Sequence, residues 1–152
     1  MIDTLPSLND PDTRERYTNA AVKAFVRIAR QWGLTEAQQL ALLGESISRP
    51  KLSEWKREER SKRPLSRDQM ERVSYLLGIY EGLERVFRHA PHEVERWMRR
   101  PRQEPPFDGI SPLDVMLARG IEGLAAVRRY VDGATGGPPS RSWHTIGAAR
   151  EG

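Results

Sequence analysis

The residues with the clearest chemical capacity in this sequence are cations gathered between positions 49 and 67. Eight basic side chains stand there against three acidic ones, which gives the segment a net charge of +5, while the whole chain carries +4. The eight are Arg49, Lys51, Lys56, Arg57, Arg60, Lys62, Arg63 and Arg67. A basic block on an otherwise balanced chain is typical of a protein that binds a polyanion, and nucleic acid is the first candidate.

These cations follow the pattern of two short helices joined by a turn, over residues 36–57. Thr35 is a suitable N-cap for the first helix, and Gln38 stands where it completes a capping box. Gly44 ends that helix, and Ser48 is a suitable N-cap for the second. The spacing predicts a helix-turn-helix, in which the second helix lies in the major groove of DNA and the first crosses the backbone.

The second of these helices is expected to turn a polar face outward. Leu52 and Trp55 lie three residues apart and are predicted to face the core. Arginine and lysine bind guanine edges or phosphates, and serine bonds to either. The predicted DNA-binding residues are therefore Ser48, Arg49, Lys51 and Lys56 on the helix, with Arg57, Arg60, Lys62 and Arg63 beside the phosphate backbone. An ordinary helical bundle with a solvated charged face is the alternative.

Catalytic and metal-binding chemistry is not predicted. The absence of cysteine excludes disulfides, thiol catalysis and cysteine–zinc sites, and it fits a reducing cytoplasm. His89 and His92 are three residues apart, but Pro91 between them argues against a continuous helix, and no third ligand accompanies them. No glycine-rich phosphate loop or nucleophile motif occurs. We therefore expect no enzyme activity, no cofactor and no metal.

The rest of the chain must position these residues, and its apolar periodicity predicts helices alone. One apolar stripe begins near Thr13 and is ended by Gly33. A second capping box at Ser66 opens the longest periodic run, which extends to Phe87, and Pro91 begins a further short helix. No stretch alternates apolar and polar residues as a strand does, so the predicted fold class is all-α.

Glycine and proline mark the breaks within this pattern. Gly78 and Gly82 lie inside the longest run, where they either allow another helix to approach closely or are merely tolerated. Ser111 and Pro112 begin another helix, and Gly120 breaks the stripe before a last one. No apolar run approaches the ~18–20 residues of a membrane span, and no secretory signal is apparent, so we expect a cytoplasmic protein with no membrane partner.

The segment 84–136 also carries a recognisable motif pattern. Its matching features are the helix end at Val86-Phe87, the Pro91 to Trp97 element, Pro101, the run Phe107-x-Gly109-x-Ser111-Pro112-Leu113-Asp114, and the Gly120 break. This pattern resembles the toxin-binding domain of the Xre/MbcA/ParS antitoxin family, and the preceding helices resemble that family's Xre-type helix-turn-helix. The sequence Arg-Arg-Pro-Arg-Gln after Trp97 departs from the expected Pro-Asn type of turn.

The resemblance implies an antitoxin of a type II toxin–antitoxin system. Such a protein binds a RES-type toxin, which acts on NAD, near its active site, and represses its own operon through DNA binding. We expect a homodimer that joins its toxin in a higher-order complex and binds operator DNA. Because aromatic and arginine residues dominate interface hot spots, the predicted toxin-binding residues are Arg128, Arg129, Arg141, Trp143, His144 and Ile146.

The expected organisation divides the chain into four parts. Residues 1–12 form a mobile arm, 13–79 the helix-turn-helix domain, 80–133 a small helical domain for toxin binding or dimerisation, and 134–152 an extended C-terminal tail. Two other functions stay open. The chain could be a stand-alone helix-turn-helix transcriptional regulator with a C-terminal dimerisation domain, or a scaffold that binds protein and never touches DNA.

Overall fold

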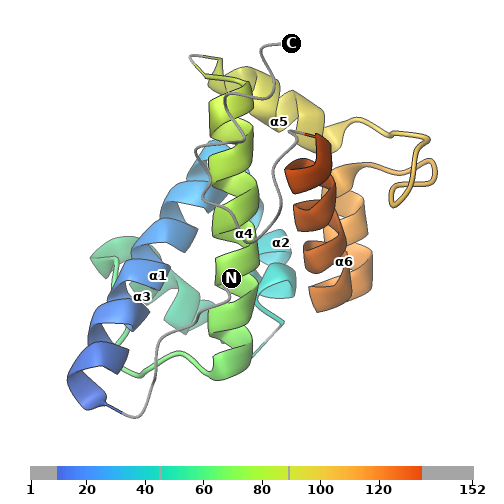
Figure 1. Ribbon diagram of the computed structural model, residues 1–152. Coiled ribbons are helices and arrows are strands. Elements are labelled where there is room, and N and C mark those ends of the chain that lie inside the picture. The colour runs from blue at the N-terminus through green and yellow to red at the C-terminus, as the bar shows by residue number, and fades with distance from the viewer. Residues whose placement is uncertain (1–9, 45, 89, 135–152) are drawn as a thin grey trace.

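The computed structural model describes residues 10–44, 46–88 and 90–134, and these form helices and no strands (Figure 1). The all-α prediction is therefore confirmed. None of the described helices combines the length and apolar content needed to cross a bilayer. The helices are α1 (Pro11–Gln31), α2 (Glu36–Leu42), α3 (Arg49–Glu58), α4 (Arg67–Val86), α5 (Pro91–Arg99) and α6 (Pro112–Ala134).

The helix ends follow the local signals of the sequence closely. The capping boxes predicted at Thr35 and Ser66 are both present. The first helix departs from expectation because it begins at Pro11, two residues before the predicted start near Thr13. Asp10 is its N-cap and accepts a hydrogen bond from the Thr13 amide at 2.9 Å. Helix therefore includes the last two positions of the predicted arm, while residues 1–9 lie outside the described residues.

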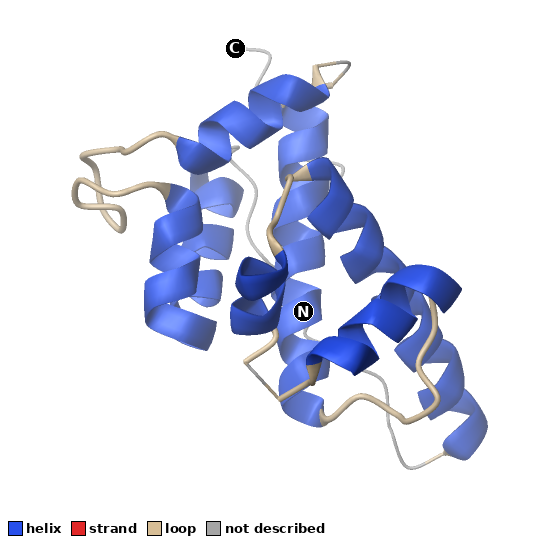
Figure 2. Ribbon diagram, turned by 180° about the vertical axis from the view of Figure 1, so that it is seen from behind, coloured by secondary structure: helices blue, strands red, loops and turns tan. Residues whose placement is uncertain are grey.

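Helix α4 is the central element of the fold. It lies between α1 and α6 in both views of the molecule and packs against each of them (Figures 1 and 2). Buried residues recur along its whole length, from Met70 through Leu76 and Ile79 to Leu83. They belong to one hydrophobic cluster that extends from Val22 on α1 to Val131 on α6. The described chain is thus built around a single core rather than two separate ones.

Helix α6 is broken at Gly120, as the sequence predicts. Gly120 has φ 62° and ψ −139°, which is not helical, so the two parts of α6 fold against each other. The closest approach is at Gly123, where an added Cβ would lie 2.4 Å from the carbonyl oxygen of Val115. Glycine is required there because backbone fills the space a side chain would need. Gly78 and Gly82 on α4 are both buried. At these two positions the backbone of α4 itself, with no side chain, faces the neighbouring atoms of the core.

Replacing Gly123 with alanine tests this close contact. We expect Gly123→Ala to lower the free energy of unfolding by ~1–3 kcal/mol, because the two parts of α6 must move apart. Urea unfolding followed by circular dichroism measures the change. Gly133→Ala in the same helix is the matched control, because its added Cβ meets nothing within 4 Å. Equal unfolding midpoints for the two variants would contradict the contact.

Candidate functional site

Helix α3 is fixed against α1 by the two apolar residues that were predicted to face inward. Leu52 is 0% exposed and Trp55 is 2% exposed. The Trp55 ring meets Phe25 of α1 edge-on, with centroids 6.2 Å apart and planes at 80°. The Ser48 hydroxyl accepts a hydrogen bond from the Lys51 amide at 3.3 Å and begins the helix. The opposite side of α3 is therefore held facing solvent.

Side chains of α4 form hydrogen bonds with the turn between α2 and α3. Arg72 donates a hydrogen bond to the Leu42 carbonyl at 3.4 Å, at the end of α2. Gln69 donates to the Ser46 hydroxyl at 2.7 Å. Gly44 has φ +81°, and a Cβ there would lie 3.0 Å from the Arg72 guanidinium. Helix α4 thus sets the angle between the two helices of the helix-turn-helix through polar contacts that the sequence pattern did not reveal.

The predicted DNA-binding residues lie along α3 and the connection that leads to α4. Lys51 is half-buried, and the exposed members are Ser48, Arg49, Lys56, Arg57, Arg60, Lys62 and Arg63. Arg49 forms an ion pair with Glu36 of α2 at 2.5 Å, and Arg57 lies 3.7 Å from Glu58. Exposed pairs of this kind contribute little to stability. Their cations therefore remain able to pair with a phosphate.

Four of these cations line two cavities, two in each. The first, of about 490 Å³, includes Lys51 and Arg63 together with Ser48 and Ser66, and none of the described residues that line it is acidic. Hydroxyl and cationic donors without a carboxylate suit a phosphate. The structure thus brings together two predicted residues from different elements.

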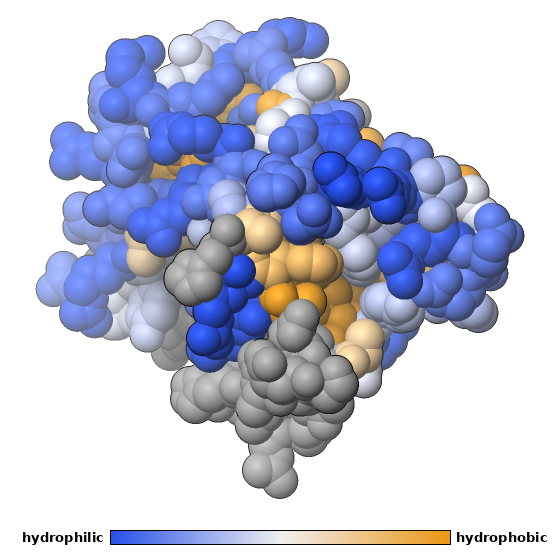
Figure 3. All heavy atoms as spheres, turned by 90° about the horizontal axis from the view of Figure 1, so that it is seen from above, coloured by the Kyte–Doolittle hydropathy of each residue, from blue (hydrophilic) through white to orange (hydrophobic). Residues whose placement is uncertain are grey.

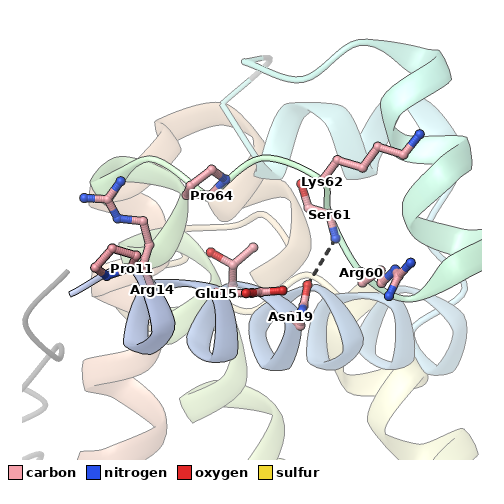
Figure 4. Close-up of a pocket in the computed structure, with 9 residues that line it drawn as sticks. Pro11, Arg14, Glu15, Asn19, Arg60, Ser61, Lys62 and Pro64 are labelled. Carbon is pink, nitrogen blue, oxygen red and sulfur yellow. Dashed lines mark hydrogen bonds between the residues drawn. The ribbon is translucent and has the colours of Figure 1, made fainter. Parts of the chain in front are cut away.

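The second cavity, of about 460 Å³, lies between α1 and the connection (Figure 4). Arg60 and Lys62 line it from the connection, and Arg14 lines it from α1. Figure 4 shows the hydrogen bond from the Ser61 amide to the Asn19 side chain, 3.3 Å long, that joins the two sides. Arg14 is a cation that the sequence reasoning missed, because nothing local in the sequence places it beside residues of the connection.

In the C-terminal half, Arg102 is packed within three aromatic rings. Its guanidinium carbon lies 5.7 Å from the ring centroid of Trp97, 6.0 Å from Phe107 and 5.8 Å from Tyr130. Phe107 meets Tyr130 edge-on at 4.8 Å and is 1% exposed. Arg102 also donates a hydrogen bond to Glu104 at 2.9 Å. Arg102, Trp97, Phe107, Tyr130 and Glu104 are called the Arg102 cluster below.

Glu104 is the carboxylate of this cluster, and its pKa is strongly lowered. The hydroxyl of Tyr130 donates to it at 2.7 Å. That hydrogen bond is the largest of the effects that lower the pKa of Glu104 to about 2, and the bond from Arg102 adds to it. Glu104 therefore stays ionised at neutral pH and holds Tyr130 and Arg102 in place.

Arg128, which the sequence predicts to bind the toxin, is buried in this structure. Arg128 is 7% exposed and lies 3.6 Å from Asp132, which is 2% exposed. Burial lowers the pKa of Arg128 and raises that of Asp132 to about 6, and the attraction between the two groups opposes both shifts. Arg128 points into the protein because it lies four residues after Leu124, which is itself buried.

The other residues predicted from the sequence fall into two groups. Arg129 is exposed, next to the inward-facing Arg128. Arg141, Trp143, His144 and Ile146 lie outside the described residues, as does His89. His92 is exposed and 3.7 Å from Glu93. Among the described residues, no three histidine or acidic side chains are grouped closely enough to hold a metal ion.

Arg99 on α5 connects the two halves of the chain. It donates hydrogen bonds to the carbonyls of Trp32 at 2.8 Å and Gly33 at 2.9 Å. These carbonyls end α1, just before α2 begins. The end of the molecule that carries α5 is mostly hydrophilic, with apolar areas visible among the charged residues (Figure 3). A cation at the C-terminus of a helix is favoured by the helix dipole.

The fold and its surfaces define a helix-turn-helix protein whose central helix continues into a second helical domain. A model of the antitoxin Xre-like helix-turn-helix domain matches residues 18–78, and one of the antitoxin Xre/MbcA/ParS C-terminal toxin-binding domain matches residues 82–137. The chain belongs to this antitoxin family. It is also 34% identical over 129 residues to the uncharacterized protein y4oB of Sinorhizobium fredii, an alignment that covers 85% of this chain and 95% of that relative.

Removing the Tyr130 hydroxyl tests the Arg102 cluster. In Tyr130→Phe we expect the pKa of Glu104 to rise from about 2 toward its ordinary 4.5, because its main hydrogen bond is removed. The lowered pKa adds stability that is present above pH 4.5 and lost as pH falls toward 2. The difference in free energy of unfolding between wild type and Tyr130→Phe should therefore become smaller as the pH falls from 4.5 toward 2.

Carbon-detected NMR of the Glu104 carboxyl gives the pKa directly. Tyr80→Phe is the control, because the Tyr80 hydroxyl lies near Glu84 and Arg27 instead. If the pKa of Glu104 were the same in wild type and Tyr130→Phe, the tyrosine hydroxyl would not be the group that lowers it.

Proposed function

We propose that this antitoxin neutralises a RES-type, NAD-consuming toxin by binding near its active site, and represses its own operon through the helix-turn-helix. The observation that carries the proposal is the match of residues 82–137 to a toxin-binding domain, joined without a break to a helix-turn-helix domain. The helices of both halves pack against the buried residues of α4. One chain can therefore bring a toxin and an operator together.

The exposed side of α3 and the connection supports DNA binding. Ser48, Arg49 and Lys51 are at the start of α3, the end of a recognition helix that reaches base edges. Arg57, Arg60, Lys62 and Arg63 follow and are exposed, as phosphate contacts require. Operators are read by two-fold dimers as a rule, so the proposal includes a homodimer that joins the toxin in a higher-order complex.

Toxin contact is assigned to the end of α6 and the sequence after it. Arg129 is exposed there, and the other proposed residues are Arg141, Trp143, His144 and Ile146. Arginine, tryptophan and apolar anchors are the residues that dominate hot spots. Arg128 is left out of this set because it is buried beside Asp132.

Substitution of two cations tests the DNA half of the proposal. We expect Arg49→Ala/Lys51→Ala to abolish specific binding to the DNA upstream of the gene while leaving any toxin complex intact. Removing one cation that binds a phosphate makes the slope of log affinity against log salt shallower by about 0.9. Fluorescence anisotropy at several salt concentrations measures both the affinity and this slope.

Lys23→Ala/Arg30→Ala is the matched control for charge, because both residues are exposed cations on α1 and the same two charges are removed. If this control weakened binding as much as Arg49→Ala/Lys51→Ala, the effect would be one of net charge and not of the helix-turn-helix. Tight binding by Arg49→Ala/Lys51→Ala would place the DNA contacts elsewhere.

The toxin half is tested first by capture of the tagged full-length chain from its own host, followed by mass spectrometry. We expect a stoichiometric RES-type partner whose NAD consumption stops when this chain is added. Truncation after Gly133 should then abolish neutralisation and spare DNA binding, because it removes the four proposed contacts that follow α6, from Arg141 to Ile146, and leaves the core residues in place. Recovery of specific DNA without a protein partner would favour the stand-alone regulator.

A further inference from the structure

The loop that joins α5 to α6 stands away from the helices of the molecule (Figures 1 and 2). Its base is closed by two backbone hydrogen bonds. The Arg102 amide donates to the Ile110 carbonyl at 3.2 Å, and the Gly109 amide donates to the Arg102 carbonyl at 2.7 Å. Asp108 and Gly109 turn the chain with φ values of 49° and 99°. The loop therefore has a defined backbone although it projects from the core.

The inner side of the loop is held by the Arg102 cluster. Phe107 is fully buried, and Glu104 accepts hydrogen bonds from Tyr130 on α6 and from Arg102 within the loop. A π-face, a cation and a carboxylate together hold one loop conformation. Little conformational entropy is left for the loop to lose when it contacts a partner, and this lowers the cost of binding.

The outer side of the loop exposes an apolar residue. Ile110 is 41% exposed, and Tyr17 on α1 is the other large apolar residue with comparable exposure in the described part of the chain. A single exposed apolar side chain is ordinary on a surface. Because the loop has a fixed conformation, Ile110 can bind a partner without first being ordered. Two exposed cations precede the loop: Arg100 at its start, and Arg96 on α5, which lies 3.6 Å from Glu93.

We propose that the 102–110 loop is a pre-formed docking element for the toxin, in which Ile110 enters an apolar socket on the toxin. This inference rests on the proposed function. The toxin is favoured as the occupant because the loop lies in the middle of the region that matches a toxin-binding domain. The neighbouring arginines imply that acidic side chains surround the socket. The contact is separate from the one assigned to the sequence after α6.

Placing a charge on the anchor tests the assignment. Toxin affinity is measured by biolayer interferometry, with the RES-type partner recovered by capture of the tagged chain as the probe. We expect Ile110→Asp to weaken the complex roughly 30-fold, the loss typical of a hot-spot residue. Tyr17→Asp is the matched control, because it places the same charge on the other exposed apolar residue, and its toxin affinity should equal that of wild type. Both variants should keep the melting temperature and the DNA affinity of the full chain.

A second variant weakens the contact between the loop and α6 and leaves Ile110 unchanged. Tyr130→Phe removes the hydrogen bond to Glu104, so we expect a smaller, few-fold weakening that appears mainly as faster dissociation. Unchanged toxin affinity in Ile110→Asp overturns the inference and leaves the proposed function standing. Loss of self-association in Ile110→Asp by light scattering, with toxin affinity kept, also overturns it and assigns the loop to the dimer. If wild type binds no toxin, the proposed function and this inference fall together.

Discussion

The burial of α4 between α1 and α6 is the constraint on which the rest of the structure depends. Leu76 and Ile79 are 0% exposed near the middle of this helix, where the helix-turn-helix match ends at residue 78 and the toxin-binding match begins at residue 82. The two functional regions therefore meet inside a continuous buried helix. Close-packed protein interiors do not bend freely, so the two regions share one orientation instead of moving on a linker.

Two arginines extend this constraint to the helix-turn-helix. Arg72 bonds to the end of α2, and Arg99 bonds to the end of α1, just before α2 begins. Each side chain satisfies carbonyl groups that the end of a helix leaves without partners. Arg72 comes from α4 and Arg99 from α5, so the helix-turn-helix is held on two sides by elements that also support the C-terminal half. Turning it against that half would break the Arg99 bonds.

Local signals in the sequence predict much of this fold, and contacts between distant residues are what they miss. N-caps, capping boxes and the Gly120 break depend on neighbours a few residues away, so helix positions follow from the sequence. Arg102 and Tyr130 are 28 residues apart, and Arg99 and Trp32 are 67 apart, so no local pattern joins them. For the proposed DNA-binding face, the inward positions of Leu52 and Trp55 follow from their spacing. The cavities that group Lys51 with Arg63, and Arg14 with Arg60, depend on how the connection packs.

Arg128 shows that residue type can mislead where spacing does not. Two adjacent arginines before a polar tail suggest an exposed cationic pair, yet Leu124, Arg128 and Asp132 are spaced by four and share one helix face. Leu124 is 0% exposed, and the face that buries it buries the other two. A buried ion pair of this kind adds little net stability, but removing one partner strands a charge in the core. The pair therefore limits how the end of α6 can pack against α4.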